Sequence, residues 1–321
     1  MEYKKILITG VTGSGGSYLA EFINNNFKKV KLYGISRWHS TSSSKNLEGI
    51  TDKIKLFDVD LNDLSSTFNA IRKIKPDFIF HLASHANVRL SFDNPKAVID
   101  NNISSTINLL EAIRLNNITP KLQICSTSEV YGKVNKKDVP INENCAIKPA
   151  SPYAVSKVCQ DLLGKTYFYN YGMKVITTRM FSYLNPRRED LFATSFAKQV
   201  ALIEKGKLKY LKHGNLKSTR TLIDVRDAMS AYWYAITKGR VGETYNIGGK
   251  KILEVGEFLE ILKSKSKTKI VSKIDKSLLR PTDVTLQIPD TSKFRSHTGW
   301  KPIYSFEDSL EMLLDYWRKI V

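Results

Sequence analysis

Tyr153 and Lys157 are the two residues whose types and spacing point most directly to catalysis. In the segment Tyr-Ala-Val-Ser-Lys they stand four residues apart, which places a phenol and an ammonium on one face of a helix. A nearby cation stabilises a phenolate, so we expect Lys157 to lower the pKa of the Tyr153 hydroxyl toward the range of a general base. Taken singly, either residue is more typical of an ordinary protein surface.

Three further candidates lie upstream, in the segment Cys-Ser-Thr-Ser-Glu-Val-Tyr-Gly at residues 125–132. An apolar run that predicts a strand leads into this segment, and ligands of open α/β sheets bind at the carboxyl ends of strands. Thr127, Ser128 and Glu129 would then bring two hydroxyls and a carboxylate to that edge of the sheet. A strand end alone would explain Thr127, and a helix cap would explain Glu129.

A glycine-rich turn near the start of the chain is the predicted dinucleotide-binding site. Residues 5–9 form an apolar run typical of a covered parallel strand, and residues 17–23 show apolar residues at helical spacing. Glycines between them allow a tight turn and close packing, and the N–H groups at the helix start then face a pyrophosphate. An ordinary tight turn is the alternative. The predicted cofactor residues of the turn are Gly10, Thr12, Gly13, Ser14, Gly15 and Gly16.

The end of the second apolar run, at residues 35–40, contains Arg37 and no acidic residue. A carboxylate there would bind the ribose 2′-hydroxyl of NAD, whereas arginine accommodates the 2′-phosphate of NADP. We therefore predict NADP, with NAD as the alternative cofactor and a surface charge as the alternative role of Arg37. The other predicted cofactor residues lie at or just after the ends of the third and fourth apolar runs, or belong to the candidate catalytic pair, and are Asp60, Leu61, Leu82, Ala83, Tyr153 and Lys157. A helix cap explains Asp60 almost as well.

Strand-like and helix-like stretches alternate through the first half of the chain. The predicted strands are 5–9, 30–35, 54–57, 78–82, 122–126 and 175–178, and the predicted helices include 63–72 and 97–114. This alternation indicates an α/β fold with a doubly wound parallel, or Rossmann, sheet. After about residue 182 the pattern loosens, although 218–235 and 243–247 resemble returns to the sheet.

We therefore predict two interleaved domains. The dinucleotide-binding domain would comprise residues 1–181 plus about 218–247. A smaller C-terminal α/β domain for the substrate would comprise about 182–217 and 248–321.

The composition excludes several classes of protein. The chain has 321 residues, 42% hydrophobic and 25% charged, so it can bury a large core and is neither disordered nor fibrous. It contains no run of about 18 or more apolar residues, and its first residues lack the apolar region of a secretory signal. We expect a soluble, cytoplasmic protein with no membrane partner.

The formal net charge of +19 could indicate binding to nucleic acid or to an acidic ligand. The lysines are scattered, and no basic helix is interleaved with stacking aromatics, so we expect no nucleic-acid partner. Cys125, Cys145 and Cys159 lack disulfide or metal-ligand spacing and are expected to be reduced thiols. His81 and His85 stand four residues apart without the acidic partner of a metal motif, so no metal site is predicted.

Together, the glycine turn, the Ser-Thr-Ser-Glu-Val-Tyr-Gly segment and the Tyr-x-x-x-Lys helix resemble the extended short-chain dehydrogenase/reductases that act on nucleotide sugars. Within that superfamily the chain is most similar to the GDP-mannose 4,6-dehydratases. Residues 15–22, 151–154, 186–188, 214–216 and 280–284 carry this similarity. Two segments depart from the family pattern: Ser14-Gly15 replaces Gln-Asp, and Ser-Tyr-Leu-Asn at 182–185 replaces Asn-His-Glu-Ser.

The resemblance implies a lyase of deoxysugar biosynthesis that converts GDP-mannose or a related GDP-sugar to its 4-keto-6-deoxy product. Thr127 would hydrogen-bond the substrate and Tyr153 would accept the C4 hydroxyl proton. Lys157 would adjust the pKa of Tyr153. Glu129 would remove the C5 proton, and Glu129 or Ser128 would protonate the leaving C6 hydroxyl. Substrate-binding residues implied in the same way, four of them arginines suited to phosphate oxygens, are Ser84, Arg187, Arg188, Arg220 and Arg280.

The resemblance also implies a homodimer or homotetramer built through helices at 97–114 and 153–169. Two other functions stay open at this point. A nucleotide-sugar 4-ketoreductase or 4-epimerase would keep the Thr, Tyr and Lys but would need no carboxylate for C5. A non-catalytic nucleotide- or RNA-binding protein would use the same fold and the positive charge for phosphate contacts.

Overall fold

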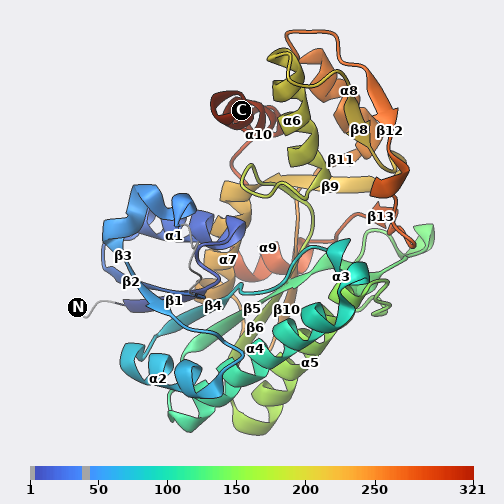
Figure 1. Ribbon diagram of the computed structural model, residues 1–321. Helices are drawn as coiled ribbons and strands as arrows, with labels where there is room; N and C mark the ends of the chain where they lie inside the picture. Colours follow the sequence, from blue (N-terminus) through green and yellow to red (C-terminus); the bar gives the residue numbers. More distant parts are fainter. Residues whose placement is uncertain (1–3, 38–43) are drawn as a thin grey trace.

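A seven-stranded parallel sheet is the largest element of the structure, a computed structural model that describes residues 4–37 and 44–321 (Figure 1). The strands are β1 (Lys4–Thr9), β2 (Val30–Ser36), β3 (Ile54–Asp58), β4 (Phe78–His81), β5 (Lys121–Thr127), β6 (Lys174–Met180) and β10 (Thr244–Ile247). Their order is β10-β6-β5-β4-β1-β2-β3, and all neighbouring pairs are parallel. The order reverses between β1 and β4, the switch point of a doubly wound fold. The predicted Rossmann sheet is confirmed.

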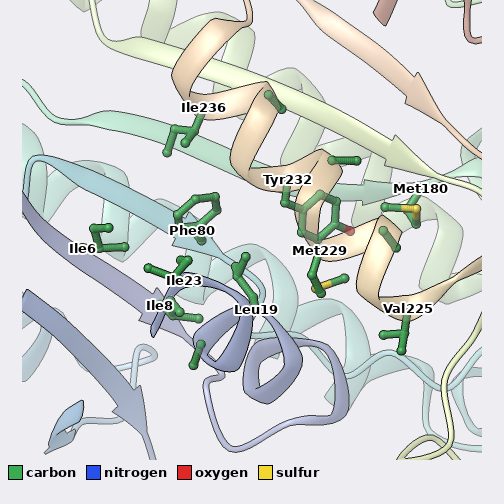
Figure 2. Packing of buried hydrophobic residues seen from close by; sticks show 14 of the residues in the cluster. Ile6, Ile8, Leu19, Ile23, Phe80, Met180, Val225, Met229, Tyr232 and Ile236 are labelled. Atoms are coloured by element: carbon green, nitrogen blue, oxygen red, sulfur yellow. The ribbon is translucent and has the colours of Figure 1, made fainter. Parts of the chain in front are cut away.

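Helices cover both faces of this sheet (Figure 1). One layer contains α1 (Ser14–Asn26), α7 (Val225–Lys238) and α9 (Ser292–Thr298), and the other contains α2 (Leu64–Ile74), α4 (Pro95–Leu115) and α5 (Pro152–Tyr171). Successive side chains of a strand point to opposite faces, so Ile6 and Ile8 of β1 face the first layer and Leu7 faces the second. Figure 2 shows the first layer, where α1 and α7 pack on the sheet through Leu19, Ile23, Val225, Met229, Tyr232 and Ile236.

Local sequence signals fix the ends of the elements that carry the candidate catalytic residues. Ser151 caps α5, its hydroxyl accepting a hydrogen bond from the Ala154 N–H at 3.1 Å, and Gly172 ends the helix at a positive φ of 63°. A short 3₁₀ helix, η2 (Ser128–Tyr131), follows β5 and begins at Thr127, whose hydroxyl accepts from the Glu129 N–H at 3.3 Å. The remaining short helices of this part are η1 (Lys45–Lys53), α3 (Leu90–Asp93) and η3 (Lys136–Asp138).

A smaller unit with its own core lies above the large sheet in Figure 1. Its main sheet contains β11 (Lys251–Glu254), β9 (Thr219–Asp224), β13 (Leu286–Gln287) and β7 (Tyr183–Leu184), and β8 (Leu211–His213) pairs separately with β12 (Ser272–Ile274). The helices are α6 (Phe192–Glu204), α8 (Val255–Ser264), α10 (Phe306–Ile320) and the short η4 (Lys276–Leu278). Leu222 of β9, Phe258 of α8 and Leu313 of α10 meet in its core.

One strand assignment from the sequence is wrong. Residues 218–235 are predicted to return to the large sheet, but residues 219–224 form β9, the strand of the smaller unit to which β7, β11 and β13 all pair. Within residues 218–247 only α7 and β10 return, so the chain crosses between the units where Asp224 caps α7 by accepting from the Arg226 N–H at 2.7 Å. A buried strand before a capped helix has the same pattern in either sheet, because strand pairing is decided in three dimensions. The two-domain division stays a prediction.

Two expectations about the chain as a whole can be compared with the structure. The three cysteines are free thiols, as predicted. Among the described residues, none of the helices combines the length and the apolar composition needed to cross a membrane.

Candidate active site

A cavity of about 790 Å³ extends from the glycine turn across the carboxyl edge of the large sheet to the smaller unit. Such a volume is typical of small-molecule and cofactor sites. All predicted site residues line it except Arg187. The structure thus brings the predicted dinucleotide turn, the acid–base candidates and three of the four predicted substrate arginines into one continuous space.

The glycine turn fits a dinucleotide pyrophosphate. Gly10 has a φ of +67°, and a Cβ on it would lie 2.8 Å from the Ala83 Cα, so only glycine is accommodated. Gly13 precedes α1 without a side-chain cap, and no acidic residue stands in the described first turn of the helix. The backbone N–H groups at this helix start are therefore available to an anion, as a phosphate-binding turn requires.

Arg37 lines the same cavity at the end where β2 and β3 lie. Its Nη2 lies 3.2 Å from the His85 Nε2, and burial, followed by the charge of Arg37, lowers the pKa of His85. The neutral imidazole therefore accepts from the guanidinium. Asp60 also lines the cavity, but its Oδ1 accepts from the Asn62 N–H at 3.0 Å, as in the cap alternative. Trp38, His39 and Ser40 lie outside the described residues.

Tyr153 and Lys157 both line the cavity from α5, but their electrostatics differ from expectation. The Lys157 ammonium donates to the Cys125 carbonyl at 2.8 Å and lies 5.9 Å from the centre of the Tyr153 ring. Burial raises the pKa of Tyr153 above its ordinary value, and the cation that opposes this rise most is Arg188. Desolvation dominates in this arrangement, and the Lys157 ammonium is bonded to a carbonyl, so the effect of Lys157 on the pKa of Tyr153 stays a prediction.

Glu129 is held by residues of both units. Its backbone N–H is bonded to the Thr127 hydroxyl, which anchors it to the end of β5. Its Oε1 accepts from the Gln287 Nε2 at 3.2 Å and lies 3.9 Å from the Arg280 Nη1. Gln287 belongs to none of the motifs recognised in the sequence. Its signal in the sequence is that of one polar residue between the apolar Leu286 and Ile288.

The predicted substrate arginines divide into two groups. Arg188, Arg220 and Arg280 line the cavity, and Arg188 is fixed by Asp190 at 3.0 Å and the Ala86 carbonyl at 2.7 Å. Arg187 instead forms an ion pair with Glu21 at 2.6 Å and covers the ring of Tyr18.

The Arg187 guanidinium ties its loop to α1 through Ser17 and Glu21, so its role as a substrate ligand stays a prediction. Ser84 lines the cavity too. Among the described residues its buried hydroxyl has no hydrogen-bond partner, so it is available to a ligand.

The two histidines singled out in the sequence do not share a site. His81 is buried, with one ring nitrogen 2.9 Å from the Thr9 hydroxyl and the other 3.0 Å from that of Thr106, and burial lowers its pKa to about 3. Its imidazole is therefore a neutral link between β1, β4 and α4. No group of three or more metal-ligating His, Cys, Asp or Glu residues occurs within residues 4–37 and 44–321.

The sequence of this chain was compared with models of protein families and with known relatives. The sequence model of a family described as GDP-mannose 4,6 dehydratase matches residues 7–313, nearly the whole chain. The chain belongs to the GDP-mannose 4,6-dehydratase family. The GDP-mannose 4,6-dehydratase of Vibrio cholerae is 30% identical, with 97% of this chain and 93% of the relative aligned. The GDP-6-deoxy-D-mannose reductase of Pseudomonas aeruginosa is 28% identical over 77% of this chain and 82% of its own.

Solved structures share the fold of this family member. A dTDP-glucose 4,6-dehydratase from Bacillus anthracis, in complex with NAD, matches with a TM-score of 0.84 and 25% identity over 99% of this chain and 97% of its own. The protein RMD from Pseudomonas aeruginosa, complexed with NADPH, matches with a TM-score of 0.84 and 24% identity over 99% and 100%. The nucleotide-sugar resemblance and the fold expected from the sequence are both confirmed.

The buried His81 generates a prediction about acid stability. Its pKa is about 3 in the folded chain, against about 6.5 for an exposed histidine, so the unfolded chain binds the proton more readily. The free energy of unfolding should therefore fall as the pH falls below about 6.5, and this contribution should continue toward about 3. Urea unfolding at several pH values measures this. As the pH falls, the free energy of unfolding should decrease less steeply for His81→Gln than for the wild type. Identical slopes would contradict the prediction.

Proposed function

We propose that this chain is an NADP-dependent 4,6-dehydratase whose substrate is GDP-mannose or a related GDP-sugar. The observation that carries the proposal is the position of Glu129. A dehydratase needs a carboxylate for the C5 proton, and Glu129 shares one cavity with Tyr153 and the dinucleotide turn. Family membership supports the same chemistry and supplies the choice of GDP-mannose.

The cofactor would lie along the glycine turn, with its pyrophosphate at the start of α1 and its reactive ring near Tyr153 and Lys157. When bound, such a cofactor would supply the hydride acceptor for oxidation at C4 and the hydride donor for reduction at C6. Tyr153 accepts the proton of the C4 hydroxyl, so that a 4-ketone forms. Arg188 assists by opposing the effect of burial on the pKa of Tyr153.

The elimination uses the other side of the cavity. The 4-ketone acidifies the C5 proton, and the Glu129 carboxylate accepts it. The C6–O bond then breaks, and the departing oxygen takes a proton from Glu129 or Ser128 and leaves as water. Arg220 and Arg280 line the wall beside Glu129 and supply planar, bidentate donors suited to the diphosphate of the substrate.

The choice of NADP rests on Arg37. It is the charged side chain at the end of β2, and no acidic residue stands beside it in the described part of that turn. Among the structural neighbours, RMD is complexed with NADPH and the dTDP-glucose 4,6-dehydratase with NAD, so both cofactors occur on this fold.

We also propose a homodimer, with the tetramer as the larger alternative, through α4 and α5. These helices pack together, and α5 presents an apolar stripe to solvent. Val155, Leu162 and Tyr169 are spaced by seven residues and are 40%, 53% and 74% exposed. Residues at this spacing lie on one face of a helix, where a second copy would cover them.

The first prediction of the proposal separates dehydratase from reductase or epimerase. Glu129→Gln keeps the side-chain shape but removes the base, so water loss from the right nucleotide sugar should fall by about 10²- to 10⁴-fold. Oxidation at C4 should survive, and absorbance at about 340 nm should therefore accumulate without 6-deoxy product. Tyr153→Phe should abolish even that absorbance. Mass spectrometry of the product measures turnover. If Glu129→Gln turns over at the wild-type rate, Glu129 is only structural, and the proposal of a 4-ketoreductase or 4-epimerase replaces that of a dehydratase.

A second prediction concerns the cofactor. Arg37→Ala should weaken NADP binding by about 1.5–3 kcal/mol, because a charged hydrogen bond to the 2′-phosphate is lost, and should leave NAD binding nearly unchanged. Titration calorimetry with both cofactors measures the difference. Equal affinity of the wild type for NADP and NAD would refute the choice of NADP.

A third prediction concerns assembly. The wild type should sediment as a dimer or tetramer at micromolar concentration, and Leu162→Glu should shift it to monomer, because a charge in an apolar interface is costly to desolvate. Leu64→Glu on α2, where the leucine is 39% exposed, is the matched control and should not change the assembly. A wild type that sediments only as monomer would contradict the proposed interface.

A further inference from the structure

Gln287 is a buried polar residue that no step described so far uses. It is the last residue of β13 and is 3% exposed, and its Nε2 donates to the Glu129 Oε1 at 3.2 Å. Most buried polar groups are hydrogen-bonded, and the apolar side chains of its neighbours Leu286 and Ile288 offer the Gln287 amide no partner. The acceptor of its hydrogen bond is the Glu129 carboxylate, which is the proposed base for the C5 proton.

The backbone on both sides of Gln287 is fixed. Gln287 pairs with Arg220 in the register between β13 and β9. The next residue, Ile288, accepts from the Ile141 N–H at 2.8 Å, so the strand end is also tied to the larger unit. Gln287 therefore reaches Glu129 from a rigid position, which is what a group that orients another side chain requires.

Arg280 contacts the same carboxylate differently. Its Nη1 lies 3.9 Å from the same Oε1, and its side chain is 31% exposed. It is also a proposed ligand of the substrate diphosphate. A diphosphate that draws Arg280 toward itself would weaken the ion pair with Glu129, because one guanidinium would then serve two anions. The Gln287 amide carries no charge and has no other role in the cavity, so it would stay on Glu129.

We propose that Gln287 is a positioning residue that holds the Glu129 carboxylate toward C5 during elimination. The inference rests on the proposed dehydratase function and deepens it. Gln287 transfers nothing: Glu129 accepts the C5 proton, the C6–O bond breaks, and water leaves with the C6 oxygen. Loss of the Gln287 donor therefore slows elimination and spares both substrate binding and the oxidation at C4, in which Tyr153 is the base.

The test uses Gln287→Met, which keeps an unbranched side chain of similar length and removes the N–H donor. The full-length protein is supplied with NADP and GDP-mannose, and product formation is followed as the mass loss of one water. We expect kcat to fall about tenfold, the equivalent of one lost hydrogen bond, with KM within about twofold of the wild type. Absorbance at about 340 nm should accumulate in a single turnover, because C4 oxidation then outpaces elimination.

Gln123→Met is the matched control. Gln123 is a buried glutamine of β5 that does not line the cavity and that bonds to Thr178. Its variant should show no accumulation at about 340 nm, whatever its stability, because it leaves the Glu129 contact intact. Gln287→Leu, which also lacks the donor, serves as the second variant if Gln287→Met does not fold, and the same accumulation is expected of it.

The outcomes distinguish the two proposals. A wild type that removes water from no nucleotide sugar overturns the dehydratase function and the inference with it. A wild type that dehydrates GDP-mannose, together with a Gln287→Met variant that has the same kcat and no accumulation, overturns only the role of Gln287. Equal slowing of oxidation and elimination in that variant also overturns it, because a merely structural residue would have that effect.

Discussion

Parallel strand pairing is the constraint on which the rest of this structure depends. Because β1, β4 and β5 all run in one direction, their carboxyl ends lie at one edge, and the glycine turn, the loop at Ala83–Ser84 and the segment Thr127–Glu129 all follow those ends. Parallel strands also need crossover connections, and these supply the helices that bury both faces of the sheet. The core and the site therefore follow from the same pairing.

Burial at that edge sets the electrostatics of the cavity. It raises the pKa of Tyr153 and lowers that of Lys157, so each group is pushed toward its neutral form. Charges on neighbouring residues oppose these shifts: Arg188 lowers the pKa of Tyr153, and Asp161, one turn from Lys157 on α5, raises that of Lys157. Asp161 is in turn paired with the buried Arg179 at 2.8 Å. The charge states of this candidate acid–base pair thus depend on charges outside its own motif.

The smaller unit completes a site that the large sheet cannot form by itself. Arg220, Arg280 and Gln287 come from β9, from the loop before β13 and from β13, and they lie on the side of the cavity where Glu129 ends. In the proposed reaction, the large sheet would hold the dinucleotide while the smaller unit would hold the diphosphate and orient the carboxylate. The chain crosses between the units at β9 and α7, which couples their positions through continuous secondary structure.

Local patterns in the sequence were sufficient for the Rossmann strands, for the glycine turn and for the candidate acid–base residues that line the cavity. Apolar runs, caps and glycine positions act over a few residues, so they can be recognised without knowing the partners. The sequence was insufficient wherever a residue's role depends on a distant partner. Arg187 and Arg188 are neighbours in sequence, but Arg187 pairs with Glu21 whereas Arg188 lines the cavity. Strand β9 likewise pairs with strands that lie far from it in sequence. The contact of Gln287 with Glu129 joins residues 158 positions apart, and only packing in three dimensions decides such a contact.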